Sequence, residues 1–148
     1  MEVIYRFAVK EDMKKILALI KELAIYEKAG NAVTNTTKQL ERDGFTEKLF
    51  KVIVAEYKQE IIGIALYFPR YSTWKGKCIH LDDIIVTKKY RRKGIGKKLI
   101  DLVIKDAKYF GAKLVIWEVL SWNTAAIDFY KKIGAKFDDE WIQCKLYL

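Results

Sequence analysis

The sequence predicts an α/β protein with helices flanking a mixed central sheet, and three observations lead to that prediction. Apolar residues recur at helical spacing in several segments, among them residues 10–28 and 94–110. Two apolar, β-rich segments, 51–57 and 61–68, are separated by only three residues, which is typical of a β-hairpin. Strand-like and helix-like segments alternate along the rest of the chain. The predicted order of elements is β-α-α-β-β-β-α-β-α-β.

The boundaries of the elements follow from capping and turn signals. Thr36 and Gln39 match a capping box ahead of a short helix. Asn123 is a good N-cap for the last helix. Pro69 is predicted to end the second strand of the hairpin, with a loop over residues 70–77. The expected strands are residues 3–9, 51–57, 61–68, 78–86, 114–120 and 141–148, and the expected helices are residues 10–28, 37–43, 94–110 and 124–132.

The composition is that of one folded domain, which we expect to cover residues 1–148. Hydrophobic residues make up 51% and charged residues 32%, which excludes a disordered chain. No apolar run reaches about 18 residues, so we expect no membrane partner. The N-terminal segment lacks the apolar core of a signal peptide. Cys78 and Cys144 show no metal-ligand spacing, so we expect reduced thiols in a cytoplasmic protein and no bound metal.

The net charge of +9 is concentrated in one short segment. Residues 88–98 contain seven Lys or Arg residues and no acid. A protein that binds nucleic acid usually spreads its charge over a face or groove, so we expect no nucleic acid as partner. Charge this concentrated favours one compact polyanion, although a solvated charge run remains the plainer alternative. A basic nucleic-acid-binding module is kept as a remote alternative.

Within the basic segment, residues 91–96 read Arg-Arg-Lys-Gly-Ile-Gly at the expected junction of a strand and a helix. Glycine lets the backbone approach a ligand closely, because it has no Cβ and tolerates positive φ. The free N–H groups at a helix N-terminus favour an anion. The motif therefore indicates phosphate binding, although it is neither a Walker A loop nor the Gly-x-Gly-x-x-Gly dinucleotide motif.

Taken with their surroundings, these motifs resemble those of the GNAT acetyltransferase superfamily. The Arg-x-x-Gly-x-Gly motif follows a strand with two adjacent acids, Asp82 and Asp83, and precedes the Asn-Thr-Ala-Ala segment at 123–126. Within the superfamily the chain is most similar to the diamine (spermidine/spermine) N-acetyltransferase group. The segments that carry this resemblance are residues 23–27, 43–45, 81–86, 90–91, 94–96, 122–123, 129–131, 133–135 and Trp141.

The resemblance implies an N-acetyltransferase that moves an acetyl group from acetyl-CoA to a primary amine. A diamine or polyamine is the expected acceptor, and a lysine-like amino acid is the alternative. The pyrophosphate of acetyl-CoA would lie on the amides of residues 92–97, and the pantetheine arm would pair with the backbone of residues 84–86. The implied cofactor-binding residues are Ile84, Ile85, Val86, Arg91, Arg92, Lys93, Gly94, Ile95, Gly96, Lys97, Asn123, Thr124, Ala125 and Ala126.

Tyr130 is the expected general acid. Aminolysis of a thioester expels a thiolate, and a free thiol has a pKa of about 8.5 whereas a phenol has one of about 10. A tyrosine is therefore protonated at neutral pH and can donate a proton as the sulfur leaves. The alternative is a buried helical tyrosine with a structural role.

Asp82 stands where the family has a glutamate that acts as the base. An alkylammonium with a pKa of about 10.4 must lose its proton before it can attack. Because the Asp82 side chain is one methylene shorter than glutamate, we expect it to act through a water molecule. The alternative is a structural aspartate at a bulge.

The resemblance further implies that Tyr26, Glu27, Asp83 and Trp141 bind the amine. Carboxylates would hold an ammonium group, and aromatic faces would add a cation–π attraction of about 0.5–2 kcal/mol. A solvated acid at a helix end is the alternative for Glu27, and a core or dimer contact is the alternative for Trp141. The family also implies a homodimer.

Overall fold

The structure is a computed structural model that describes residues 1–148, and it divides into two compact units, Met1–Trp117 and Glu118–Leu148. The first unit contains a five-stranded sheet and three α-helices. Its strands are β1 (Ile4–Phe7), β2 (Lys51–Tyr57), β3 (Glu60–Ser72), β4 (Gly76–Val86) and β5 (Leu114–Ile116). Its α-helices are α1 (Met13–Tyr26), α2 (Thr37–Glu41) and α3 (Ile95–Phe110), and short 3-10 or π-helical turns lie at Lys10–Asp12, Gly30–Ala32, Arg42–Thr46 and Lys88–Tyr90.

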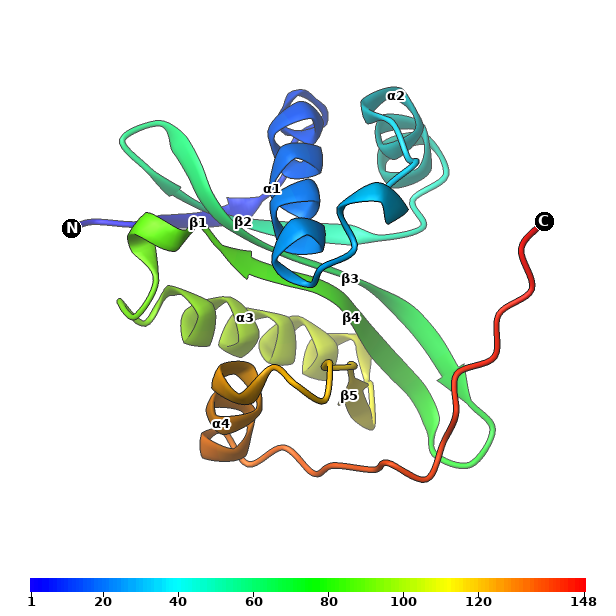
Figure 1. Ribbon diagram of the computed structural model, residues 1–148. Helices are drawn as coiled ribbons and strands as arrows, with labels where there is room; N and C mark the ends of the chain where they lie inside the picture. Colours follow the sequence, from blue (N-terminus) through cyan, green and yellow to red (C-terminus); the bar gives the residue numbers. More distant parts are fainter. The chain divides into compact units, whose positions relative to one another are not determined.

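The sheet of the first unit is mixed. Its strands lie in the order β1-β2-β3-β4-β5, antiparallel throughout except for the parallel pair of β4 and β5. Helices α1 and α2 cover one face of the sheet, and α3 covers the other (Figure 1). This arrangement confirms the predicted α/β fold class with helices flanking a mixed sheet. None of the helices combines the length and the apolar character that crossing a bilayer requires.

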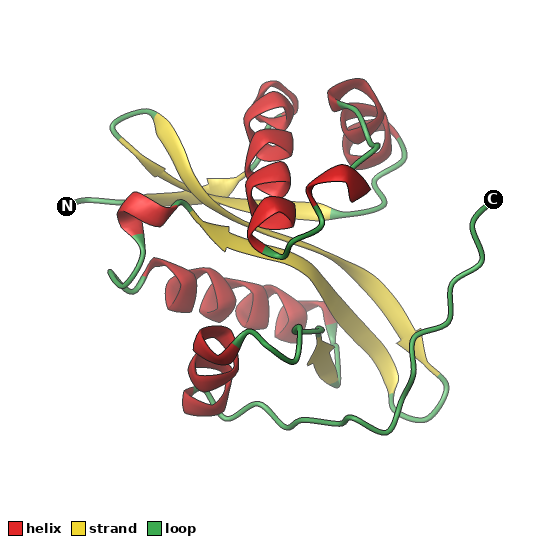
Figure 2. Ribbon diagram, viewed as in Figure 1, coloured by secondary structure: helices red, strands yellow, loops and turns green.

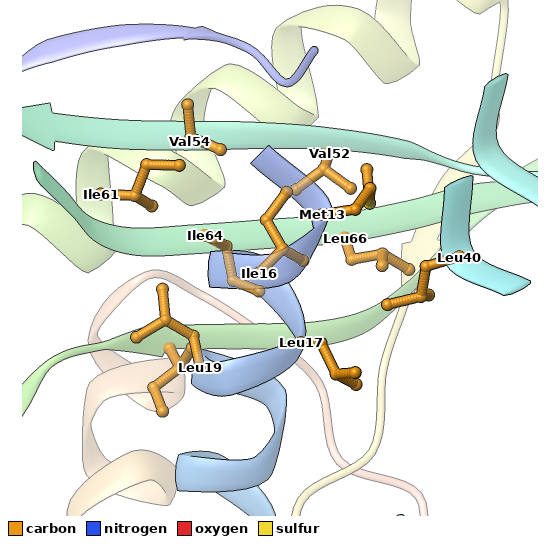
Figure 3. Close-up of a cluster of buried hydrophobic side chains, with 11 residues drawn as sticks. Met13, Ile16, Leu17, Leu19, Leu40, Val52, Val54, Ile61, Ile64 and Leu66 are labelled. Carbon is orange, nitrogen blue, oxygen red and sulfur yellow. The ribbon is translucent and has the colours of Figure 1, made fainter. Parts of the chain in front are cut away.

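A cluster of buried apolar side chains packs α1 and α2 against the sheet (Figure 3). The apolar face of α1 contributes Met13, Ile16 and Leu19, which pack against strand residues such as Val54 and Ile64. These five side chains are at most 2% exposed. Because burial of apolar surface contributes about 25 cal/mol per Å², this packing fixes the N-terminal half of α1 against the sheet.

The hairpin of β3 and β4 is longer than the sequence predicts. Pro69 does not end β3, since it pairs with Ile79, and the expected loop at residues 70–77 is mostly strand. The register of β2 against β3 stops at Tyr67, so β3 has no neighbour on that side beyond this residue. A proline is tolerated there because its missing N–H can point away from the ladder.

The second unit contains one helix, α4 (Thr124–Lys132), and an irregular C-terminal segment (Figure 2). The side-chain oxygen of Asn123 accepts a hydrogen bond from the N–H of Ala126 at 3.3 Å, which confirms the predicted N-cap. The strand predicted at 141–148 is not formed, and the one predicted at 114–120 stops at Ile116. An alternating pattern forms a strand only where a neighbouring strand completes the ladder, and residues 141–148 have none.

Candidate active site

A β-bulge lies in the middle of β4. Leu66 of β3 pairs with Asp83 and Tyr67 pairs with Leu81, so Asp82 is an extra residue without a partner. Bulges locally increase twist, re-aim side chains and are common next to active sites. The two adjacent acids in the middle of β4 therefore lie at an irregularity of the ladder. Their side chains do not follow the regular alternation between the two faces of the sheet.

Three carboxylates act on one another at this bulge. Burial raises the pKa of Asp83 to about 7, with further contributions from the charges of Asp82 and Glu27. Burial, and then the charge of Asp82, also raises the pKa of Glu27, which is the C-cap of α1. The side chain of Asp82 is 55% exposed. The end of α1 and the bulge of β4 thus form one acidic cluster, which favours a cationic ligand.

His80 lies beside this cluster on β4. Its Nε2 atom is 3.7 Å from Oδ1 of Asp82, and its ring stacks on Phe68 with the centroids 5.0 Å apart. The stacking fixes the imidazole ring near the exposed aspartate. This contact follows from the pairing of Phe68 with His80 across β3 and β4, which the sequence alone does not reveal.

The Arg91 side chain joins the end of β4 to the end of α1. Its Nε donates a hydrogen bond of 2.8 Å to the carbonyl oxygen of Val86. Its guanidinium lies over the ring of Tyr26, 5.1 Å from the centroid, and is 4.0 Å from Glu22. The segment expected to bind acetyl-CoA therefore also places a cation beside a residue expected to bind the amine.

The loop before α3 leaves several backbone amides available for an anion. Lys98 donates to the carbonyl of Gly94 in the first turn of α3, so the amides of residues 95–97 have no acceptor within the helix. Gly94 is the N-cap of α3 with a φ of 78°, and it has no side chain that could accept a hydrogen bond from these amides. A Cβ at Gly94 would meet no atom within 4 Å, so the loop is open on that side. These features fit a pyrophosphate.

The C-terminal half of β4 has one open edge. β5 pairs with β4 only from Cys78 to His80, so no strand covers that side of residues 84–86. The other side of the same residues pairs with β3. The pantetheine arm is expected to add its backbone hydrogen bonds at this unpaired edge of β4.

The second unit carries the remaining expected site residues. Tyr130 is the buried residue of α4, and its ring centroid is 5.6 Å from that of Phe129. The indole N–H of Trp141 donates to Asp138 at 2.9 Å, and the side chain is largely exposed. Neither unit gathers three or more His, Cys, Asp or Glu side chains that could hold a metal ion.

The structure brings together some of the expected residues and adds others. It joins Glu27, Asp82 and Asp83 in one cluster and places Tyr26 under the guanidinium of Arg91. The stacking of His80 on Phe68 and the direction of the Arg91 side chain are not apparent from the sequence, and a bulge is considered there only as the alternative for Asp82. The available signal was the acidic pair in the middle of an otherwise apolar strand, which is an unusual place for two charges.

Comparison with known proteins shows the class to which this fold and site belong. The model of the acetyltransferase (GNAT) family matches residues 13–135, and the chain belongs to this family. Among solved structures, an aminoglycoside acetyltransferase from a soil metagenome has a TM-score of 0.81 at 20% identity, covering 99% of this chain and 96% of that one. A protein from Clostridium acetobutylicum described as a predicted acetyltransferase, solved with acetyl-CoA, has a TM-score of 0.78 at 19% identity, covering 97% of this chain and 96% of that one. At these identities the likeness concerns the fold.

Curated relatives narrow the activity. Thialysine N-epsilon-acetyltransferase of Bos taurus is 41% identical over 90% of this chain and 84% of its own length. L-ornithine N5-acetyltransferase of Arabidopsis thaliana is 40% identical over 68% of this chain and 41% of its own length. A human spermidine/spermine N(1)-acetyltransferase-like protein is 34% identical over 88% of this chain and 20% of its own length. The chain is an amine N-acetyltransferase that uses acetyl-CoA.

Proposed function

We propose that the acceptor is the side-chain amine of a lysine-like amino acid such as thialysine, lysine or ornithine. The acidic cluster of Glu27, Asp82 and Asp83 carries this proposal, because three carboxylates that act on one another favour a cationic amine. The bovine and Arabidopsis relatives are named for thialysine and L-ornithine. Such an acceptor also has a carboxylate, for which the guanidinium of Arg91 is a suitable partner.

A diamine or polyamine is the second candidate. The cluster holds more negative charge than one ammonium group requires, and a second ammonium group would use it. A human relative and a Bacillus subtilis relative are named for spermidine/spermine and spermine acetylation. A polyamine has no carboxylate, so it would leave Arg91 without a role in acceptor recognition.

The roles of the site residues in this proposal follow the family resemblance. Tyr26, Glu27 and Trp141 bind the amine together with the aspartates of β4. One of these aspartates takes a proton from the ammonium group, and the family pattern gives this role to Asp82. Tyr130 of α4 donates a proton to the departing thiolate.

For acetyl-CoA, we propose that the open edge of β4 and the free amides before α3 form the binding surface. The backbone of residues 84–86 would bind the pantetheine arm, and the main chain of residues 91–97, with the amides of residues 92–97, would bind the pyrophosphate. Residues 123–126 would contact the cofactor from α4. When bound, acetyl-CoA supplies a thioester carbon that an amine can attack.

We also propose that residues 1–148 act as one acetyltransferase domain, as a cytoplasmic homodimer with no nucleic-acid or membrane partner. The family model supports one domain, because its match at 13–135 includes residues of both units.

Exposed apolar side chains on the C-terminal segment, among them Ile142 and Leu146, are a candidate dimer surface. Two free cysteines fit a reducing compartment. Light scattering on the purified chain tests the dimer.

Mass spectrometry of the products tests the acceptor most simply. The protein is incubated with acetyl-CoA and, separately, with thialysine, lysine, ornithine and spermidine. We expect acetylation on the side-chain amine of the amino acids. If spermidine is acetylated and no amino acid is, the second candidate replaces the first; if no amine is acetylated, both fail.

A further inference from the structure

The bulge in β4 decides which face of the sheet each aspartate belongs to. Asp83 pairs with Leu66, and directly paired residues share a face of the sheet. Leu66 belongs to the core that packs against α1, so Asp83 lies on that face. If Asp82 instead took a regular place in the ladder, alternation would put Asp83 on the same face as Leu81. The bulge therefore moves one carboxylate onto the face covered by α1.

The two aspartates consequently have different surroundings. Asp82 is 55% exposed and lies 3.7 Å from His80. Asp83 is only partly exposed and forms no ion pair with Lys or Arg. The charges that act on it are those of Glu27 at the end of α1 and of Asp82 beside it. The guanidinium of Arg91 contacts Val86, Tyr26 and Glu22 instead.

On the basis of the proposed function, we propose that Asp83 takes the proton from the acceptor ammonium and that Asp82 and Glu27 hold the acceptor's charge. This exchanges the roles that the family resemblance gives to the two aspartates. An exposed carboxylate is a weak base for an ammonium group, because water stabilises its charged form. A partly buried carboxylate beside like charges favours its protonated form, in agreement with the raised pKa of Asp83, about 7.

The proton balance of this reaction closes with the groups already named. The ammonium group gives one proton to the Asp83 carboxylate, and the freed lone pair on nitrogen forms the bond to the thioester carbon. Tyr130 donates a proton to sulfur as the carbon–sulfur bond breaks. The nitrogen loses a second proton as the amide forms, and this proton restores the hydroxyl group of Tyr130. Asp83 then releases its proton to solvent, and the exposed Asp82 lies next to it in the chain.

The pH dependence of turnover separates the two aspartates. For the wild type we expect kcat/KM for thialysine to rise through about pH 7 and then level off, because Asp83 accepts a proton only when ionised. Asp83→Asn should lower kcat by about 10²–10⁴-fold, the usual contribution of a general base, and abolish this rise. Asp82→Asn is the matched control and should raise KM for thialysine while a rise with pH remains, moved to lower pH because one like charge beside Asp83 is removed.

A direct titration provides a readout that needs no acetyl-CoA. In protein with ¹³C-labelled aspartate carboxyls, we expect one resonance to titrate near pH 7 and to be absent in Asp83→Asn. A resonance near pH 7 that disappears in Asp82→Asn and persists in Asp83→Asn would overturn the proposal. So would an active Asp83→Asn enzyme with an unchanged pH profile. A wild type that acetylates no amine would instead overturn the proposed function, which keeps the two failures distinct.

Discussion

The guanidinium of Arg91 contacts a residue expected to bind the amine, although Arg91 belongs to the segment expected to bind acetyl-CoA. Replacing it with alanine removes the hydrogen bond to Val86 and the contact with Tyr26. We predict that Arg91→Ala raises KM for the amine about tenfold, the scale of one charged hydrogen bond. Arg92→Ala is the control in the same segment and should weaken only acetyl-CoA binding. Equal effects of both variants on the amine KM would contradict this assignment.

Asp83 also makes the stability of the protein depend on pH. Its pKa is about 7 in the folded state, above the value of about 3.9 expected when unfolded, so the folded state binds more protons between these values. Stability should therefore fall as the pH rises from about 4 to about 7. We predict that Asp83→Asn is more stable than the wild type at pH 8, by about 1–3 kcal/mol, but not at pH 4. Urea unfolding at the two pH values checks this, and a constant difference would contradict it.

Tyr130 is tested by removing its hydroxyl group alone. We predict that Tyr130→Phe keeps its fold and its affinity for acetyl-CoA but lowers kcat by about 10²–10⁴-fold, the usual contribution of a general acid. Stopped-flow measurement of thiol release under single-turnover conditions isolates the chemical step. Turnover equal to that of the wild type would leave Tyr130 with a structural role only.

Much of the candidate site could be predicted residue by residue, but its geometry could not. The acidic pair in the middle of β4 and the glycines before α3 can be identified directly in the sequence, and their chemistry follows from residue type. The difference between Asp82 and Asp83 is not visible, because it depends on a register shift opposite Leu66 and Tyr67 in another strand. The direction of the Arg91 side chain similarly depends on how the end of α1 packs.

At the scale of elements, one hydrogen-bonded group links α3 to the sheet. The hydroxyl of Tyr67 in β3 donates to Asp106 of α3 at 2.7 Å, and Nζ of Lys51 lies 3.1 Å from the same carboxylate. We predict that Tyr67→Phe lowers the free energy of unfolding by about 1–3 kcal/mol, because the partly buried carboxylate loses a donor. Tyr71→Phe, at an exposed tyrosine of the same strand, is the control and should change little. Equal effects in urea unfolding would contradict the argument.

The helices and strands also show where the local sequence pattern is sufficient to predict an element. β2 and α3 lie close to their predicted bounds, and Thr36 accepts the predicted capping hydrogen bond from the N–H of Gln39 at 3.1 Å. Each of these depends on residues close in sequence. The extension of β3 past Pro69 and the absence of a strand at 141–148 depend instead on which neighbour is present, and a single strand's own pattern does not encode that.

For the whole molecule, the net charge of +9 opposes long-range attraction of a cationic acceptor, so the acidic cluster must act locally. Physiological salt screens exposed charges beyond about 8 Å, whereas partly buried charges such as Asp83 are screened much less. Recognition should therefore depend on short-range contacts between the site and a second charged group on the acceptor.

The measurement that tests this account most directly compares kcat/KM for thialysine, spermidine and pentylamine. The rate is measured as the release of free thiol from acetyl-CoA. All three present a primary amine, but only the first two carry a further charged group. The account predicts that thialysine exceeds pentylamine by about 10- to 100-fold, the scale of one charge-assisted contact. Equal values for thialysine and pentylamine, or no thiol release with any of the three, would contradict it.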